Sequence, residues 1–204
     1  MILNLITPPS EEPLTLEEVE GQVRLPGQLA DEAEFAQGLI SAVRELAESV
    51  TKRALITQTW EMILDDFPNG REEIVIPLPP LQTINSIIYI DNQGNVQTMD
   101  ALDYRVVLNK SGYSYVMPVY GKYWPNTLND IAVIKVNFVC GYGPIDPSTE
   151  LNIPKPILQW MKINFANLFE NRESVVIEAS RAVLMDTTPM IADGLIANYR
   201  MVRL

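Results

Sequence analysis

The sequence predicts an α+β fold: N-terminal helices and a C-terminal helix packed together, with an inserted antiparallel β-sheet or small barrel and an extended C-terminal arm. Apolar residues recur at helical spacing before residue 53 and over 154–170, whereas apolar and polar residues alternate along much of 55–141. The 204 residues, 47% of them hydrophobic, can bury a core. We therefore expect one domain over 1–172 and an arm over 173–204.

Three helices are expected before the arm. Over 15–25, Thr15 is followed three residues later by Glu18, the capping-box pattern of a helix start. Over 154–170, two prolines open a helix that is apolar almost all round, which indicates burial on more than one side. Over 31–53, one apolar stripe marks an amphipathic helix, formed by Phe35, Leu39, Val43, Leu46 and Val50.

The region 55–141 is expected to be β. Period-2 alternation begins at 57–64, and turn-forming residues separate the apolar runs that follow. The proline-rich run 77–80 cannot lie inside a central strand, so it is a connector or an edge. The strands are expected over 57–64, 74–76, 84–90, 96–99, 104–108, 113–119 and 131–140.

The arm differs from the rest of the chain. It is apolar without strong periodicity, and a short terminal helix is expected near its end. Such a segment either folds back on its own domain or docks on another subunit. Arginines also leave it relatively basic on an acidic protein, and arginine is a frequent interface anchor. The residues expected to bind a partner are the apolar Ile191, Leu195 and Tyr199 and the charged Arg200 and Arg203.

The composition argues against catalysis. The chain has no histidine and one cysteine, Cys140, so it lacks Ser-His-Asp triads, Cys-His pairs and zinc sites built from those residues. No phosphate-binding loop or dinucleotide glycine pattern occurs. We expect no enzymatic activity, no cofactor and no metal, and we expect Cys140 to be a buried structural thiol.

Charge and hydropathy restrict the partners. The formal net charge of −11 repels phosphate backbones and argues against a protein that wraps or reads DNA. The start lacks the basic segment of a signal peptide, and no run of about 18 apolar residues occurs that could span a bilayer. We expect a protein that is soluble where it is made, with no membrane partner.

Three patterns could carry chemistry, and each has a simpler structural explanation. Asp65 and Asp66 flank a turn, where aspartates accept local hydrogen bonds. Residues 91–95 lack the spaced acids and the closing glutamate of an EF-hand, so a hairpin turn is expected. Aromatic residues between 113 and 124, interleaved with lysines, suit strands and protein interfaces as well as stacking on bases or sugars.

These patterns leave two alternative functions open. One is a carboxylate-based, glycosidase-like enzyme acting on cell-wall sugar, which would need two carboxyl groups facing one cleft. The other is a carbohydrate-binding or host-attachment module built on the β region.

Several segments in order carry a resemblance to a known family: LTLEEV (14–19), TKRALITQTWEMILDDFP (51–68), IPLPPLQTINSIIYID (76–91), YGKYWP (120–125), FVCGYG (138–143), and IPKPI with ENRE (153–173). With its order of helices, β insertion, helix and arm, the chain resembles the head-tail connector, or adaptor, proteins of tailed bacteriophages and gene transfer agents. The resemblance extends over most of residues 14–200.

The resemblance implies a structural virion protein of the neck, made in the host cytoplasm. It would form a homo-oligomeric ring, twelvefold in such connectors, beneath the portal protein. The ring would continue the DNA channel toward a downstream neck or tail protein, and genomic DNA would pass without sequence-specific binding. The helices over 31–53 and 154–170 have more apolar surface than a small β region can cover, so we expect them to form the inter-subunit scaffold through Leu39 and Leu168.

Overall fold

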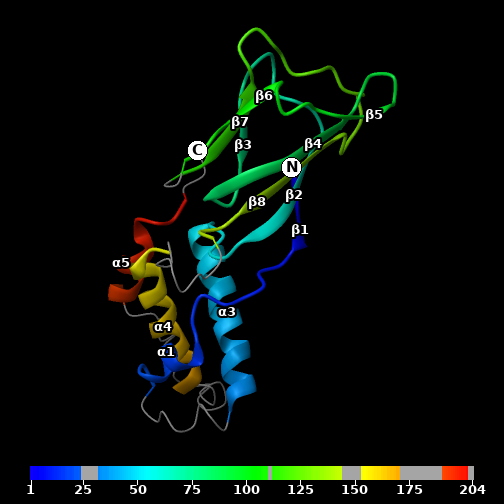
Figure 1. Cartoon of the computed structure of the whole chain (residues 1–204). Helices are drawn as coiled ribbons and strands as arrows, with labels where there is room; N and C mark the ends of the chain where they lie inside the picture. Colours follow the sequence, from blue (N-terminus) through cyan, green and yellow to red (C-terminus); the bar gives the residue numbers. More distant parts are fainter. Residues whose placement is uncertain (24–31, 110–111, 144–152, 171–189, 202–204) are drawn as a thin grey trace, which may run out of the picture. The chain divides into compact units, whose positions relative to one another are not determined.

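The computed structural model describes residues 1–23, 32–109, 112–143, 153–170 and 190–201 (Figure 1). The chain divides into two compact units. The β unit comprises Met1–Ser10 and Lys52–Asp146, and the helical unit comprises Glu11–Thr51 and Pro147–Leu204. Helices and antiparallel sheets therefore occur in one chain, which confirms the predicted α+β class.

The β unit contains two open antiparallel sheets, so a sheet rather than a barrel describes it. The larger sheet has the order β1 (Ile2–Thr7), β2 (Gln58–Leu64), β8 (Ile134–Cys140), β4 (Leu81–Ile90) and β5 (Val96–Thr98). The smaller has the order β3 (Ile74–Ile76), β7 (Ser114–Pro118) and β6 (Tyr104–Val107). The run 77–80 connects β3 to β4, as its prolines predicted.

Strand alternation builds the core of the β unit. In β8, every second side chain from Ile134 to Cys140 is buried, because successive side chains of a strand point to opposite faces of the sheet. These side chains join Met62 of β2 and Val116 of β7 in one hydrophobic cluster. Cys140 is fully buried, with its Sγ 3.8 Å from the carbonyl oxygen of Gln58, which confirms the predicted structural thiol.

The chain makes a close turn after β8, at Gly141. Its φ of +119° lies in a region that side-chain-bearing residues rarely adopt, and a Cβ there would lie 2.3 Å from the carbonyl oxygen of Ile56. The Gly141 amide donates to the carbonyl oxygen of Pro80 at 2.9 Å. Glycine is therefore required at position 141, where the end of β8 and the start of β4 lie against the backbone that leads into β2.

Strand β1 was not predicted. It pairs antiparallel with β2 from Ile2, opposite Ile63, to Thr7, opposite Thr59. The segment ILNLIT alternates weakly and is closed by two prolines, which are strand signals. Its partner lies more than fifty residues away, so only the tertiary pairing makes the strand evident.

The helical unit contains α1 (Leu16–Glu20), α3 (Ala33–Thr51), α4 (Lys155–Glu170) and α5 (Met190–Ala197). The capping box at the start of α1 is confirmed: the Glu18 amide donates to Thr15 Oγ1 at 3.2 Å and the Thr15 amide donates to Glu18 Oε2 at 3.0 Å. Helix α1 is shorter than the predicted 15–25, whereas α3 and α4 follow their predicted ranges closely. Both α3 and α5 pack against α4.

Candidate interaction surfaces

The buried face of α3 is not the predicted stripe. Within the helical unit, the side chains of Ala36, Ile40 and Ala47 are fully buried. Among the predicted stripe residues only Val43 is buried, while Phe35 and Leu46 are 46% and 41% exposed. Small residues can let a neighbouring helix approach closely. A prediction based on large apolar side chains therefore misses the alanines of the buried face.

The remaining stripe residues form a second apolar line, which we call the outer stripe of α3: Phe35, Leu39, Leu46 and Val50. At about 100° per residue they lie within about 60° of one another around the helix axis. The centre of the buried face lies roughly 100° away. Leu39 and Val50 are half-buried. Helix α3 thus turns one apolar face toward its own unit and carries a second, narrower apolar face, the outer stripe, next to it.

Helix α4 also keeps an apolar side chain exposed. Ile157, Met161 and Phe165 are fully buried, but Leu168, which was predicted to belong to an inter-subunit scaffold, is 46% exposed. The rings of Phe35 and Phe169 lie 6.0 Å apart and join the start of α3 to the end of α4. The helical unit therefore exposes leucines on both of its long helices.

The described part of the predicted arm contains the expected short terminal helix, and this helix packs in its own unit. Helix α5 contacts α4, and its Ile196 is fully buried. Beyond α5, the Met201 amide donates to the carbonyl oxygen of Thr51 at 3.0 Å, at the end of α3. The reason is that Ile196 gains apolar contacts within its own unit.

The five residues predicted to bind a partner lie in or near α5. Leu195 and Tyr199 are half-buried, and Arg200 is exposed. Ile191 lies within α5, but its side chain is outside the described part of the structure, as is the whole of Arg203. The structure thus places Leu195, Tyr199 and Arg200 in one short segment of the helical unit.

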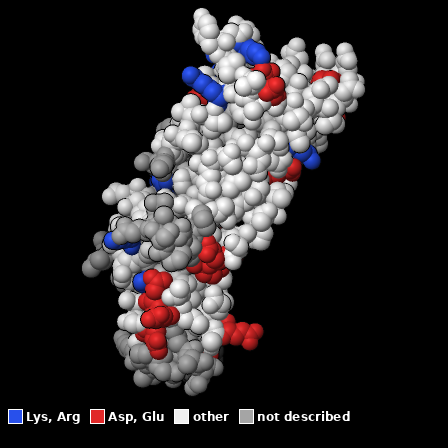
Figure 2. Space-filling view, viewed as in Figure 1, with Lys and Arg blue, Asp and Glu red and all other residues white. Residues whose placement is uncertain are grey.

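Acidic residues concentrate in the helical unit. Its sequence contains 16 Asp and Glu against 8 Lys and Arg, whereas the β unit contains 10 against 7. Figure 2 shows Asp and Glu side chains close together over the helices. The excess negative charge of the chain is therefore carried mainly by the helical unit.

Some of these acidic side chains form ion pairs within the helical unit. Arg44 is 7% exposed and its Nε lies 2.9 Å from Glu12 Oε2, while its Nη1 lies 3.0 Å from Glu48 Oε2. Burial by itself lowers the pKa of the Arg44 guanidinium, but the hydrogen bond and charge of Glu12, with the charge of Glu48, outweigh burial and raise it. The ion pair of Glu12 with Arg44 holds the segment that precedes α1 against helix α3.

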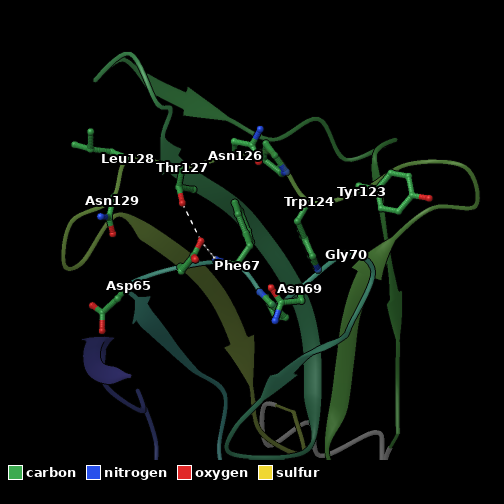
Figure 3. A pocket seen from close by; sticks show the side chains of 13 residues that line it. Asp65, Phe67, Asn69, Gly70, Tyr123, Trp124, Asn126, Thr127, Leu128 and Asn129 are labelled. Carbon is green, nitrogen blue, oxygen red and sulfur yellow. Dashed lines mark hydrogen bonds between the residues drawn. The ribbon is translucent and has the colours of Figure 1, made fainter.

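The β unit has a cavity of about 380 Å³ lined by the loops 65–70 and 123–129 (Figure 3). Asp66 Oδ1 accepts from the Phe67 amide at 2.8 Å and from Thr127 Oγ1 at 2.9 Å. Asp65 Oδ1 accepts from the Ala132 amide at 2.9 Å. Both carboxylates hold turns, as turn-flanking aspartates were expected to do, and neither is directed at a shared reaction centre by these contacts.

The aromatic residues between 113 and 124 differ in how deeply they are buried. Trp124 is buried, stacks on Phe67 with ring centroids 4.8 Å apart, and donates from Nε1 to the carbonyl oxygen of Glu72 at 2.8 Å. Tyr120 and Tyr123 are 94% and 69% exposed. Arg71 lies over the Tyr120 ring, 5.6 Å from its centroid. Trp124 is thus a structural residue, and only the tyrosines are available to a partner.

Residues 91–95 form the predicted hairpin turn between β4 and β5. Asp91 Oδ1 accepts from the amides of Gln93 and Asn95, both at 2.9 Å. Hydrogen bonds from the Gln97 side chain and the Asn95 amide hold the pKa of Asp91 below its ordinary value. The carboxylate therefore organises the turn.

In the described part of the chain, no three His, Cys, Asp or Glu side chains gather in a way that could hold a metal ion. None of the helices described there is long and apolar enough to cross a membrane.

No protein-family model and no curated protein sequence matches the chain. Chains in solved structures of gene transfer agent (GTA) particles match it in fold. A chain in the neck of an empty GTA particle, computed with C6 symmetry, has a TM-score of 0.71 at 19% identity. A chain in the virion of a native GTA particle has a TM-score of 0.68 at 19% identity, and one in the neck of a native particle, computed with C12 symmetry, 0.63 at 17%.

Each of these matches covers 100% of this chain and 97% of the other. The similarity therefore covers both units. At such low identity it shows that the fold is shared, end to end, with a chain of the GTA particle.

Proposed function

We propose that the chain is a structural protein of the neck of a phage-like particle, a head-tail connector that forms a homo-oligomeric ring beneath the portal. The observation that carries this proposal is the fold match over the full length of the chain to a chain in GTA necks. Those necks were computed with C6 and C12 symmetry, which supports many copies around one axis, and a dodecamer in particular.

The exposed apolar side chains support lateral assembly. Leu46 on α3 and Leu168 on α4 are 41% and 46% exposed in the single chain, and Leu39, which lies on the outer stripe with Leu46, is half-buried. Burying such side chains between copies releases about 25 cal/mol per Å² of apolar surface. We assign the inter-subunit scaffold to this outer stripe and Leu168.

The charge of the chain suits a DNA conduit. A net charge of −11 repels a phosphate backbone, so a ring of such chains would let DNA pass without holding it. The segment with Leu195, Tyr199 and Arg200 is our proposed contact to the portal or to a neighbouring copy, with Ile191 and Arg203 extending it. A downstream neck or tail protein would bind the opposite side of the ring.

The proposal is tested by assembly of the purified chain with its portal, followed by electron microscopy and native mass spectrometry. We expect Leu46→Asp and Leu168→Asp to remain folded monomers, because both side chains are already exposed, and to lose ring formation. Gln159→Asp is the matched control, since it adds a carboxylate at another exposed position of α4. The control should assemble like the unmodified chain.

Two results would contradict the proposal. One is a chain that remains monomeric both alone and with portal-bearing heads. The other is unchanged ring formation by both leucine variants, which would remove the outer stripe and Leu168 from the interface.

A further inference from the structure

Strand β1 is an edge strand with unusual composition. It lies at one end of the five-stranded sheet and pairs only with β2. Its sequence, ILNLIT, has no charged residue, and Ile2, Leu5 and Ile6 are 58%, 46% and 54% exposed. Within the described part of the chain, the β1 backbone makes its hydrogen bonds in the ladder with β2.

An edge strand of this kind can pair with a further strand. Backbone N–H and C=O groups on the outer side of an edge strand are a template for pairing, and soluble proteins protect long apolar edges with charges, prolines or bulges. In β1 the prolines come only after the strand, at positions 8 and 9, and the one irregularity lies between Leu5 and Thr7. Most of its outer edge is therefore open to a partner strand.

The same sheet offers a matching edge on its other side. Strand β4 pairs with β8 along its length, with register shifts between Leu81 and Thr83 and between Ile84 and Ser86. Strand β5 pairs with β4 only at Ile88–Ile90. The first part of β4, residues 81–86, also has no charged residue, and its Gln82, Thr83 and Asn85 are exposed. Each open stretch is six residues long, about 20 Å of strand.

Strand direction makes the two edges compatible. The sheet is antiparallel throughout, and β4 stands three places from β1, so the two strands run in opposite directions. A second copy added beside the first in the same orientation would place its β1 antiparallel to the first copy's β4. The alternation of directions would continue unbroken from copy to copy.

From these observations we infer that β1 of one copy pairs antiparallel with residues 81–86 of β4 in the next copy, so that the large sheets join head to tail. Such a heterologous contact uses two different surfaces and closes into a ring when the rotation between copies permits. The inference rests on the proposed function for the presence of many copies. It adds a backbone-paired contact in the β unit to the side-chain contacts proposed for the helical unit.

Disulfide trapping tests the pairing. Asn4 and Asn85 are exposed, and residues directly opposite in neighbouring strands have Cβ atoms about 5 Å apart, within disulfide range. Asn4→Cys is combined in turn with Thr83→Cys and Asn85→Cys, and assembled rings are oxidised. Within one chain the two positions are three strands apart, roughly 14 Å, so they cannot form the bond.

We expect at least one double variant to give a covalent ladder of dimers, trimers and higher species under denaturing conditions. The single variants and the unmodified chain, whose Cys140 is buried, should give none. Dimers from Asn4→Cys alone would show β1 paired with β1 and would overturn the inference. Rings without a ladder from either double variant would overturn it while leaving the proposed function intact, whereas the absence of any ring would contradict both.

A charge substitution supplies an independent test. Ile6→Lys places an edge-protecting charge on β1 and should leave the melting temperature of the single chain nearly unchanged, because the side chain is 54% exposed. We expect at least a tenfold loss of ring formation. Val107→Lys, on the edge strand β6 of the smaller sheet and 42% exposed, is the matched control and should assemble normally. Normal assembly of Ile6→Lys would overturn the inference.

Discussion

The two units build their cores differently, although both expose apolar side chains. In the β unit, side chains from both sheets close over one core, and long-range strand pairs such as β2 with β8 and β4 with β8 hold it. In the helical unit, α3 and α4 bury one face each and still expose Leu46 and Leu168. The helical unit also has twice as many acidic as basic residues.

The difference follows from geometry. A strand has only two faces, so a sheet with one face on the core leaves an alternating row for solvent. A helix has a full circumference, and a sequence can place one apolar face on its own unit and a second on another copy. Folding is thus tested at buried positions of both units. Assembly is tested at the outer stripe and Leu168 of the helical unit and at the exposed side chains of β1.

The largest effect is expected at the close turn of the β unit. Gly141→Ala puts a Cβ 2.3 Å from the carbonyl oxygen of Ile56 at a φ of +119°, so the backbone must shift. We expect a loss of several kcal/mol in the free energy of unfolding, measured by denaturant titration. Gly143→Ala is the control, with a φ of +114° but nothing within 4 Å of the added Cβ. Its cost should be only about 1–2 kcal/mol, and equal losses would show that the close approach is not what matters.

In the helical unit, Ile196→Ala tests whether α5 belongs to the fold. Ile196 is fully buried, so its truncation should lower the free energy of unfolding by about 2–5 kcal/mol. Leu195→Ala, at the neighbouring half-buried position, should cost clearly less. Both are measured by chemical denaturation of the single chain. If Ile196→Ala has no effect on stability but abolishes assembly, α5 belongs to an interface instead.

A smaller effect is expected at the ion pair of the helical unit. Glu12→Gln leaves the nearly buried Arg44 with fewer charged partners and should cost about 1–2 kcal/mol in unfolding free energy. Glu45→Gln removes the more exposed partner, whose side chain is 72% accessible, and should cost less than about 0.5 kcal/mol. Similar costs for both would mean that burial does not strengthen this pair.

The smallest effect concerns the hairpin of the β unit. Hydrogen bonds to the carboxylate keep the pKa of Asp91 below its ordinary value of 3.8, so its contribution to stability is present above that pH and is lost as pH falls through the folded pKa. Asp91→Asn should therefore melt at a lower temperature than the unmodified chain at neutral pH, and the difference should shrink below pH 3.8. A difference independent of pH would contradict this role.

Much of the fold was predictable, and the failures have physical causes. Period-2 alternation located β2, and apolar runs separated by turn-forming residues located β3 to β8, because both signals are local properties of the sequence. The capping box located the start of α1. The position of β8 between β2 and β4 is set by long-range pairing, which local patterns do not record. Strand β1 escaped prediction for the same reason.

The interaction surfaces were predictable only in part. The stripe on α3 was detected as apolar, but the helix buries the face with Ala36 and Ala47 and leaves Phe35 and Leu46 exposed. A stripe destined for a second copy cannot be told from one facing the core by spacing alone. Likewise, the apolar residues of α5 gave no indication that Ile196 would be buried in its own unit.

Cryo-electron microscopy of particle necks that contain this chain tests the central proposal most directly. We expect the chain in many copies around one axis, with Leu46 and Leu168 buried between neighbours and the ring surrounding the DNA channel below the portal. A neck in which the chain occurs as a single copy, or in which α3 and α4 turn these leucines toward solvent, would contradict it.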